Sequence, residues 1–367
     1  MKLAVLANGP GEVWGWSRPL IYEAASRGWS ISVHLLPCPF ASGKEYEVLQ
    51  RLPITGAYRH NSFFSAIRNM AKKGSYDAVL QLGGDLIFGR YLAWRHSAPL
   101  ACYSYGAKKG MKHCAKVLTS RSGLYEADNL EVVGDLVLDS LEAGSETLWN
   151  APEGHRLALF PGSRPNIRNR AFDLLKEISS VLKVLDPSIE LRTLLSPFSE
   201  DSEIEKWRDA GFSVWKGSMP AGVSGADLAI TQPGTNTLEL MYCAQPFMIV
   251  APFSFVKEVP LSGLAGMVDA IPLLGDAMKK HFVLRHAKKN AGRSAWPNRL
   301  AKKSFVPELF GDFSPTQIAE SIFSLLLNSR ELQRQRCFLK ELAGAVVPGA
   351  PSKICDILER MAASHGE

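Results

Sequence analysis

The sequence lacks the long apolar runs that mark membrane spans and secretion signals. No stretch approaches about 18 consecutive apolar residues, so no transmembrane helix is predicted. The opening residues, MKLAVLANGPGEVWG, have no charged start followed by a long apolar segment, so we expect no signal peptide. Six cysteines are scattered over 367 residues without a CxxC pair, which favours buried free thiols in a reducing cytoplasm.

Several cofactor and catalytic motifs are also absent. The eight histidines form neither HExxH nor a paired HxH, and no Asp-x-Asp motif occurs, so no metal site is predicted. GxGxxG, a Walker loop and GxSxG are missing too. Their absence disfavours dinucleotide enzymes, P-loop hydrolases and serine hydrolases, and it favours chemistry without a metal or a redox cofactor.

Charge is unevenly distributed along the chain. The formal net charge is +6, yet the segment Lys279–Lys303 alone contains nine Lys or Arg residues and no Asp or Glu. Such a block is either a solvated face or a patch for phosphate, nucleic acid or anionic lipid. The interleaved Phe282, Leu284 and Trp296 suit a lipid headgroup region, so we expect contact with an anionic membrane surface and no nucleic acid partner.

Short apolar runs bounded by turn residues alternate with helical patterns along the chain. This rhythm predicts doubly wound parallel sheets with helices on both faces. The expected strands of the first half are residues 2–7, 31–37, 76–82, 98–103, 115–119 and 130–133. Those of the second half are a strand within HRLALFPGSR, then residues 189–195, 226–231 and 247–252. The expected helices include residues 19–27, 171–185, 236–244 and a helical stretch over 315–363.

A polar stretch at about 142–155 interrupts this rhythm and indicates a domain boundary. We therefore expect a first domain over residues 1–145 and a second over residues 155–340. The remaining residues, 341–367, are expected to form a helix that packs back on the first domain. Ligands of doubly wound sheets bind outside the carboxyl ends of the strands, so the loops that follow the strands are the candidate sites.

A loop suited to phosphate follows the first predicted strand of the second half. It reads Phe160-Pro161-Gly162-Ser163-Arg164. Gly162 allows a tight backbone turn near a ligand, Ser163 offers a hydroxyl group, and Arg164 offers a planar fork of donors that matches phosphate. The alternative is an ordinary loop with a surface arginine.

A second such loop, Thr231-Gln232-Pro233-Gly234-Thr235, leads into the next predicted helix. The unpaired N–H groups at a helix start and the helix dipole favour an anion there. We assign this role to Gly234, Thr235, Asn236 and Thr237. Glu239 lies about one turn into the helix, where its carboxylate can accept hydrogen bonds from ribose hydroxyls. A helix cap by Thr235 or Thr237 is the alternative, and it is compatible with phosphate binding.

The order and spacing of these motifs resemble lipid-A-disaccharide synthases. The similar segments of the second half are LALFPGSR, TQPGTNTLELMYCAQPFMIVAP and WPNRLAKKSFVPEL. Weaker similarity in the first half covers GPGEVWG, LGGD at 82–85 and VVGDLVLDSL at 132–141. The resemblance runs over most of the chain. It implies the α/β GT-B architecture, in which two Rossmann-like doubly wound parallel-sheet domains face a cleft.

The resemblance also implies roles for individual residues. Arg164 would bind the nucleotide diphosphate, Glu239 would hold the ribose, and Asn298 would sit near the donor. Asp85 would be the catalytic carboxylate, and Glu12 would match the acid of the family's opening loop. Displacement at an anomeric carbon needs a base for the incoming hydroxyl and stabilisation of the departing diphosphate. A turn or helix-cap role is the alternative for Asp85.

Departures from the family fall mainly in the first half. Trp14 and Trp16 replace the Ser and Asp of the family's opening loop. The family's Trp-containing segment after the carboxylate loop is replaced by CYSYGAKKGMKHC, which offers Tyr103 and Tyr105. A longer segment also separates Pro252 from Trp296, and it holds most of the basic block. These changes affect the acceptor more than the donor.

Together, the residues and the resemblance predict an inverting hexosyltransferase. Its donor would be a UDP-sugar such as UDP-GlcNAc or an acylated form, and its acceptor a sugar or glycolipid. We expect it in the cytoplasm, peripheral on the inner face of the cytoplasmic membrane, and the resemblance suggests a homodimer. The alternatives are an enzyme like UDP-GlcNAc 2-epimerase and a non-catalytic protein that binds nucleotide sugars.

Overall fold

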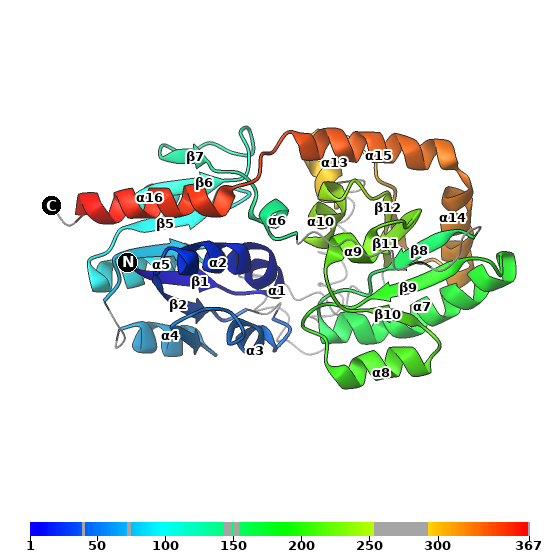
Figure 1. The fold of residues 1–367 in the computed structure, drawn as a ribbon, viewed down its shortest axis with the longest axis horizontal. Coiled ribbons are helices and arrows are strands. Elements are labelled where there is room, and N and C mark those ends of the chain that lie inside the picture. The colour runs from blue at the N-terminus through cyan, green and yellow to red at the C-terminus, as the bar shows by residue number, and fades with distance from the viewer. Residues whose placement is uncertain (39–40, 72–74, 142–148, 150–153, 253–292, 366–367) are drawn as a thin grey trace, which may run out of the picture. The chain divides into compact units, whose positions relative to one another are not determined.

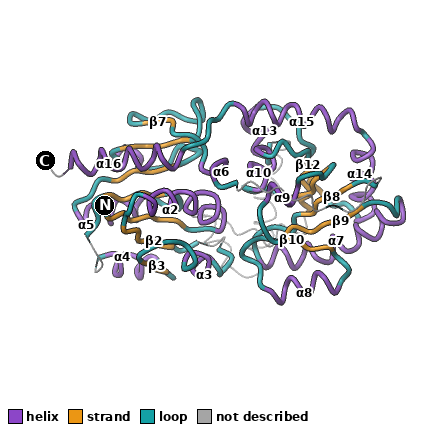
Figure 2. The backbone as a smooth tube through the Cα atoms, in the orientation of Figure 1, coloured by secondary structure: helices purple, strands orange, loops and turns teal. Residues whose placement is uncertain are grey.

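The computed structural model describes residues 1–38, 41–71, 75–141, 149, 154–252 and 293–365. They form two compact units, one of residues 1–140 with 346–367 and one of residues 141–345. We call these the first unit and the second unit. Helices flank the strands in each unit (Figures 1 and 2). No helix in the described part of the chain is long and apolar enough to cross a membrane.

The described residues of the first unit form a seven-stranded sheet whose paired strands all run parallel. Its strand order is β3-β2-β1-β4-β5-β6-β7. The strands are β1 (Lys2–Ala7), β2 (Ser30–Leu35), β3 (Gly56–Arg59), β4 (Ala78–Gln81), β5 (Leu100–Tyr103), β6 (Lys116–Thr119) and β7 (Leu130–Val132). The apolar runs that predicted β1, β2, β4 and β5 become strands with mostly buried side chains, as expected for a sheet covered on both faces.

Helices cover both faces of this sheet. They are α1 (Pro10–Glu12), η1 (Val13–Ser17), α2 (Arg18–Ser26), α3 (Glu45–Leu49), α4 (Phe63–Met70), α5 (Leu86–His96), η2 (Met111–His113), α6 (Leu136–Asp139) and α16 (Ala350–His365). One face packs Ala4 and Leu6 of β1 against Met70 of α4 and Leu92 of α5. Because strand side chains alternate, Leu3 and Val5 lie on the opposite face, which α2 and α16 cover.

The described residues of the second unit form a six-stranded sheet of parallel pairs in the order β10-β9-β8-β11-β12-β13. The strands are β8 (Arg156–Leu159), β9 (Glu190–Leu194), β10 (Ser213–Trp215), β11 (Leu228–Thr231), β12 (Phe247–Pro252) and β13 (Glu308–Gly311). The helices are α7 (Pro165–Leu185), α8 (Asp201–Asp209), α9 (Met219–Val223), α10 (Asn236–Tyr242), α13 (Trp296–Ala301), α14 (Pro315–Leu327) and α15 (Ser329–Gly344).

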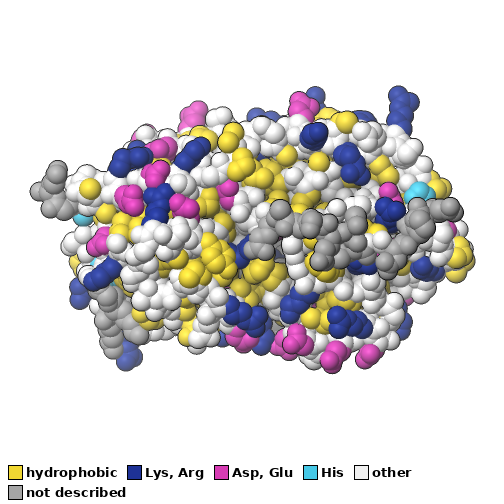
Figure 3. All heavy atoms as spheres, viewed as in Figure 1, with side chains coloured by type: hydrophobic (Ala, Val, Ile, Leu, Met, Phe, Trp, Pro, Cys, Tyr) yellow, Lys and Arg dark blue, Asp and Glu magenta, His cyan; other side chains and the backbone are white. Residues whose placement is uncertain are grey.

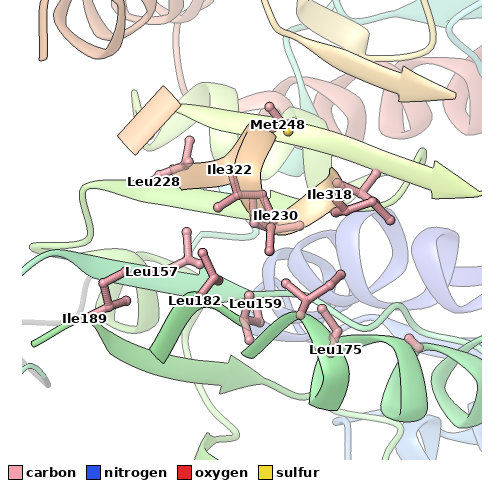
Figure 4. Close-up of a cluster of buried hydrophobic side chains, with 14 of the residues drawn as sticks. Leu157, Leu159, Leu175, Leu182, Ile189, Leu228, Ile230, Met248, Ile318 and Ile322 are labelled. Atoms are coloured by element: carbon pink, nitrogen blue, oxygen red, sulfur yellow. The ribbon is translucent and has the colours of Figure 1, made fainter. Parts of the chain in front are cut away.

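The core of the second unit lies between this sheet and the long helices α7 and α14. Leu159 of β8 and Ile230 of β11 lie among Leu175 of α7 and Ile318 and Ile322 of α14 (Figure 4). Each fully buried aliphatic side chain contributes about 1.5–3 kcal/mol through the hydrophobic effect. This core fixes the strand ends from which the candidate donor loops emerge.

The C-terminal helix α16 lies alongside α2 and belongs to the first unit (Figure 1). Asp139 of α6 accepts hydrogen bonds from the backbone N–H groups of Gly349 and Ala350, at 2.7 and 2.9 Å, and so caps the start of α16. Arg27, at the end of α2, pairs with Asp356 at 2.7 Å. Acidic and basic side chains lie next to each other over this region in Figure 3.

The structure adds detail to the expected helices and corrects one helix start. The stretch 315–363 is helical as expected, and it consists of three helices, since α14 ends at Leu327, α15 ends at Gly344 and α16 begins at Ala350. Helix α7 begins at Pro165 rather than near residue 171, since proline is favoured in the first turn of a helix. All six cysteines are free as expected, but only Cys102, Cys114 and Cys355 are buried. Cys38 and Cys243 are partly buried, and Cys337 is exposed.

Candidate functional site

The predicted site loops lie where the strand order of each sheet reverses direction. In the first unit the chain runs outward from β1 through β2 to β3 and then returns to β4 beside β1. In the second unit β8 and β11 have the same relation. The carboxyl ends of the strands at such a switch point are the usual ligand sites of doubly wound sheets. The loops after β1, β4, β8 and β11 are those that carry Glu12, Asp85, Arg164 and Thr235.

The loop after β4 is held by a buried glutamine. Gln81 donates to the carbonyl oxygens of Gly83 and Asp85, at 2.8 and 2.7 Å, and accepts from Gly89 N at 2.9 Å. A Cβ atom on Gly83 would collide with the amide oxygen of Asn8, so only glycine allows the β1 and β4 loops to approach this closely. These contacts fix the backbone from which the exposed Asp85 side chain projects.

Asp85 also caps helix α5, because its carboxylate accepts a hydrogen bond from Ile87 N at 3.0 Å. The helix-cap alternative is therefore realised in the structure. This capping bond does not occupy the whole carboxylate, because a carboxylate has several acceptor positions and the Asp85 side chain is exposed.

Glu12 lies at the start of the neighbouring loop and accepts from Gly9 N at 3.0 Å. Lys108, in the loop after β5, donates to the carbonyl oxygen of Gly84 at 3.4 Å. Burial lowers the pKa of Lys108, and nearby negative charges, including Glu12 and Asp85, oppose that shift. The carboxyl ends of β1, β4 and β5 thus bring together two carboxylates and one half-buried amine.

The aromatic residues that depart from the family pattern contact one another. The Trp16 ring meets Tyr103 and Tyr105 edge to face, at centroid distances of 5.3 and 5.1 Å. The Tyr105 hydroxyl donates to the carboxylate of Asp135 at 2.5 Å. Trp16 lies in η1, a π-helical segment, and such segments occur often at functional sites. Trp16, Tyr103 and Tyr105, from two distant segments, therefore form a single aromatic cluster that contacts Asp135.

In the second unit, the loop Phe160–Arg164, the first candidate phosphate loop, combines a glycine at positive φ with a helix start. Gly162 has a φ of +101°, which a residue with a side chain rarely adopts. Arg164 is the N-cap residue of α7, a helix of 21 residues whose dipole favours negative charge at this end. The buried Arg168 donates to Ser163 O at 2.5 Å and pairs through two nitrogens with Glu203, at 2.5 and 2.8 Å. The hydrogen bond from Arg168 thereby fixes the backbone carbonyl of Ser163.

The second candidate phosphate loop, Thr231–Thr235, is joined to the first by a hydrogen bond. Gln232 donates from its side-chain amide to Pro161 O at 3.1 Å. Thr237 donates to Gly234 O at 2.8 Å and accepts from Trp296 N at 3.1 Å. The loop backbone at Gly234 is exposed, while Thr235, Asn236 and Glu239 are partly exposed. The two predicted phosphate-suited loops are therefore held next to each other in the second unit.

Asn298, which was expected to sit near the donor, has no side-chain group left to bind a ligand directly. Its side chain is fully buried, and its amide nitrogen donates to Val306 O and to Glu308, at 2.8 and 2.9 Å. Its amide oxygen accepts from the N–H groups of Phe305 and Val306, both at 2.9 Å. Every hydrogen-bonding position of the amide is occupied, so Asn298 holds the segment after α13 instead of facing a ligand.

Only part of the basic segment Lys279–Lys303 belongs to the described residues. Residues 279–292 lie outside them, so the expected patch is not described as a whole. The described cations Arg293, Arg299, Lys302 and Lys303 are all exposed. Among the residues with described side chains, no group of three or more His, Cys, Asp or Glu could hold a metal ion.

Sequence reasoning missed the residues that support the site from a distance. The site loops are supported by hydrogen bonds and an ion pair from side chains that lie up to tens of positions away in sequence. These side chains are Gln81, Lys108, Arg168 and Glu308. Glu308 accepts from Ser294 N and Ala295 N, both at 2.8 Å, and so caps α13. The sequence contained a signal for one of these residues, because Gln81 in YDAVLQL is a polar residue within an apolar run that predicts a buried strand.

We compared the chain with protein families, curated proteins and solved structures. No protein-family model matches the sequence, and no curated protein matches it either. Solved structures do match over nearly the whole chain. MurG from Acinetobacter baumannii is 16% identical, with a TM-score of 0.54, and 98% of this chain and 100% of that chain are covered.

Two further structures are similar to this chain at the same coverage of 98%. The calicheamicin glycosyltransferase CalG4 is 14% identical over 98% of its own chain, with a TM-score of 0.59. UDP-GlcNAc 2-epimerase from Neisseria meningitidis, bound to UDP-GlcNAc, is 12% identical over 100% of its chain, with a TM-score of 0.58. At these identities the likeness shows the fold. The chain has the α/β GT-B architecture of two Rossmann-like units.

Proposed function

We propose that this protein is an inverting hexosyltransferase. It would move a hexosamine-type sugar from a UDP-sugar to a lipid-linked sugar acceptor, as in lipid A disaccharide synthesis. The observation that carries the proposal is the joined pair of donor loops after β8 and β11, linked by Gln232 and Pro161 and bordered by Arg164. This is the combination of exposed backbone, helix dipole and guanidinium that a diphosphate requires.

In the proposed reaction, UDP is held in the second unit. The Arg164 guanidinium and the start of α7 stabilise the charge that develops on the departing diphosphate. Glu239 holds the ribose, and the loop of Gly234 and Thr235 contacts phosphate. This use of the fold is supported by the epimerase of Neisseria meningitidis, whose structure holds UDP-GlcNAc.

The acceptor is activated in the first unit. Asp85 takes the proton from the attacking hydroxyl, which then displaces UDP from the anomeric carbon with inversion. Lys108 offsets the negative charges of Asp85 and Glu12 before the step, and the charge of Asp85 is lost when it accepts the proton of the hydroxyl. No metal or redox cofactor takes part in this scheme.

The second candidate is a UDP-GlcNAc 2-epimerase, because one of the structures that share this fold is such an enzyme. The third is a protein of this fold that binds nucleotide sugars without turnover. The three differ in what happens to UDP-GlcNAc and whether an acceptor is needed.

An assay of UDP release separates the three candidates. UDP-GlcNAc is incubated with and without sugar and glycolipid acceptors, and both UDP and the sugar nucleotide are quantified. The transferase releases UDP only when the right acceptor is present. Conversion of the sugar nucleotide without an acceptor would instead identify an epimerase, and binding without any conversion would identify a non-catalytic protein.

A further inference from the structure

The first unit carries exposed aromatic side chains on helices α4 and α5. Phe64 of α4 and Trp94 of α5 are the most exposed aromatic side chains in the described part of the chain, at 83% and 75%. Phe63 and Ile87 of the same two helices are each 44% exposed. Single apolar side chains are common on protein surfaces, but a group of large ones marks a site of contact with a partner or a membrane.

These side chains lie on neighbouring helices, because α4 and α5 pack against each other on the same face of the sheet. The Phe63 ring contacts Phe88 of α5 at a centroid distance of 5.4 Å. Ile87, Tyr91 and Trp94 share one side of α5, since residues three and four positions apart are neighbours on a helix. The exposed side of α5 is therefore an apolar stripe with the Phe63 side of α4 next to it.

A groove of about 920 Å³ lies beside this stripe, between α5 and the short helix η2. On the α5 side its lining includes Arg90, Tyr91 and Trp94, and on the η2 side it includes Lys112 and His113. No Asp or Glu of the described residues lines this groove. The groove thus combines apolar surface with positive charge.

The sequence around these helices contains no acidic residue. Residues 48–76 and 86–125 hold five and seven Lys or Arg residues, respectively, and no Asp or Glu. The exposed cations on α4, α5 and η2 are Arg68, Arg90, Arg95 and Lys112. This surface therefore has a strongly positive charge and suits an anionic partner.

The arrangement of cations around the stripe favours an anionic lipid surface. On α5, Arg90 and Arg95 lie on opposite sides of the stripe formed by Ile87, Tyr91 and Trp94. Aromatic rings favour the headgroup region of a bilayer, and the long arginine side chains can reach lipid phosphates from there.

Other partners suit this surface less well. A nucleic acid backbone would need cations at the centre of the surface, where the apolar side chains lie. A second copy of the chain would bring two identical cationic surfaces together, which is electrostatically unfavourable.

We infer that α4, α5 and η2 form a docking surface for an anionic lipid bilayer and that Phe64 and Trp94 enter its headgroup region. The inference goes beyond the proposed function and does not depend on it, because binding to vesicles needs neither donor nor acceptor. The surface is also distinct from the basic segment Lys279–Lys303. Asp85 is the N-cap of α5, so docking through this helix would bring the proposed base to the membrane.

Paired substitutions test the aromatic part of the surface. Phe64→Ser/Trp94→Ser removes its two most exposed side chains. Val184→Ser/Leu327→Ser is the matched control, because these apolar side chains of the second unit are 82% and 57% exposed. The full chain is titrated with vesicles of equal parts phosphatidylglycerol and phosphatidylcholine, and with vesicles of phosphatidylcholine alone. Sedimentation gives the bound fraction, and melting temperatures show that both variants fold as wild type does.

We expect wild type to bind the anionic vesicles and Phe64→Ser/Trp94→Ser to bind them at least about tenfold more weakly, through the loss of two aromatic side chains from the bilayer. The control variant should bind as wild type does. Equal binding of wild type and Phe64→Ser/Trp94→Ser would overturn the inference. So would an equal loss in the control, or a wild-type protein that binds neither kind of vesicle.

A second pair of variants tests the cations. Arg90→Gln/Lys112→Gln changes the net charge by as much as Lys176→Gln/Arg336→Gln, which replaces exposed cations of the second unit. The first variant should bind anionic vesicles about tenfold more weakly at low salt, and the difference should vanish as salt rises. The second should change binding far less. Equal losses in the two variants would show an effect of net charge alone and would contradict a defined docking surface.

Two further measurements show what covers the surface. Brominated phosphatidylcholine in the anionic vesicles quenches nearby tryptophans, and Trp94→Phe, which keeps an aromatic ring, should bind the vesicles but lose part of this quenching. Equal quenching in wild type and Trp94→Phe would exclude insertion of Trp94. Analytical ultracentrifugation without lipid should give the same mass for wild type and Phe64→Ser/Trp94→Ser. A dimer of wild type that becomes a monomer in this variant would assign the surface to a second copy and overturn the inference.

Discussion

Asp85 has two roles at once in this structure, as the cap of α5 and as the exposed carboxylate beside Lys108 and Glu12. Asparagine caps helices as well as aspartate does, but it cannot take a proton. We therefore expect Asp85→Asn to fold and bind UDP normally while its transfer rate falls by about 10²- to 10⁴-fold. Turnover and UDP affinity are measured together, with the exposed Asp128→Asn as the control. Near-normal turnover in Asp85→Asn would remove Asp85 from the role of base.

His60 makes the stability of the first unit depend on pH. Burial lowers its pKa below the usual 6.5, so in the acid range the unfolded chain binds a proton that the folded chain does not. The free energy of unfolding therefore decreases as the pH falls from 6.5 towards the lowered pKa of His60 in the folded state. His34 and Tyr76 form a chain of contacts with the ring, and Arg59 lines the same cavity of the first unit. The carboxylate of that cavity, Glu45, accepts hydrogen bonds from Ser42 N and Gly43 N.

We expect the melting temperature of wild type to fall more than that of His60→Gln between about pH 8 and pH 5, because glutamine does not titrate. Differential scanning calorimetry at several pH values gives this difference directly. Parallel curves for the two proteins would show that His60 titrates as it does in the unfolded chain.

The sequence indicated which candidate loops follow the strands at the switch points, but it did not indicate which residues support those loops. Arg164 and Asp85 directly follow strong apolar runs, so their positions at strand ends were predictable. Lys108 meets Asp85 only because β5 lies beside β4 in the sheet, and Asn298 is saturated only because the chain after α13 folds back over it. Such pairings depend on tertiary structure, which local patterns do not contain.

At the scale of elements, Asp139 links α6 to the start of α16. Its carboxylate accepts from two backbone N–H groups that no earlier turn of α16 can satisfy. We expect Asp139→Ala to lower the free energy of unfolding by about 1–3 kcal/mol, because both donors lose a partly buried acceptor. Urea unfolding provides the measurement, and Asp128→Ala, at an exposed position of the same unit, provides the control. Equal stabilities of the two variants would show that water replaces the cap without loss.

The strands that sequence patterns did not predict share a physical cause. The short strands β3 (GAYR), β10 (SVW) and β13 (ELFG) are edge or next-to-edge elements, and most of their side chains are only partly buried. A strand with one open side needs no continuous apolar run, so its sequence resembles a loop. The central strands β1, β11 and β12 are buried on both faces, and their apolar runs identified them.

At the scale of the whole molecule, membrane contact through the basic segment stays a prediction. Each cation near an anionic surface contributes about 1 kcal/mol, and the attraction weakens as salt rises. We expect the protein to co-sediment with anionic vesicles but not with neutral ones. Replacing Arg293, Arg299, Lys302 and Lys303 with Gln should reduce the bound fraction at low salt. Equal sedimentation of wild type and variant would exclude these four side chains from membrane contact.

The central claim is that the second unit binds the UDP part of the donor and that the first unit supplies the base. Calorimetric titration of UDP into wild type, Arg164→Ala and Asp85→Ala tests it most directly, with Arg170→Ala as a matched control on an exposed position of α7. We predict that Arg164→Ala weakens UDP binding by about 10- to 100-fold, the loss of charge-assisted hydrogen bonds to phosphate. Asp85→Ala and Arg170→Ala should bind UDP as wild type does. Equal losses in Arg164→Ala and Asp85→Ala, or no loss in Arg164→Ala, would contradict this division between the two units.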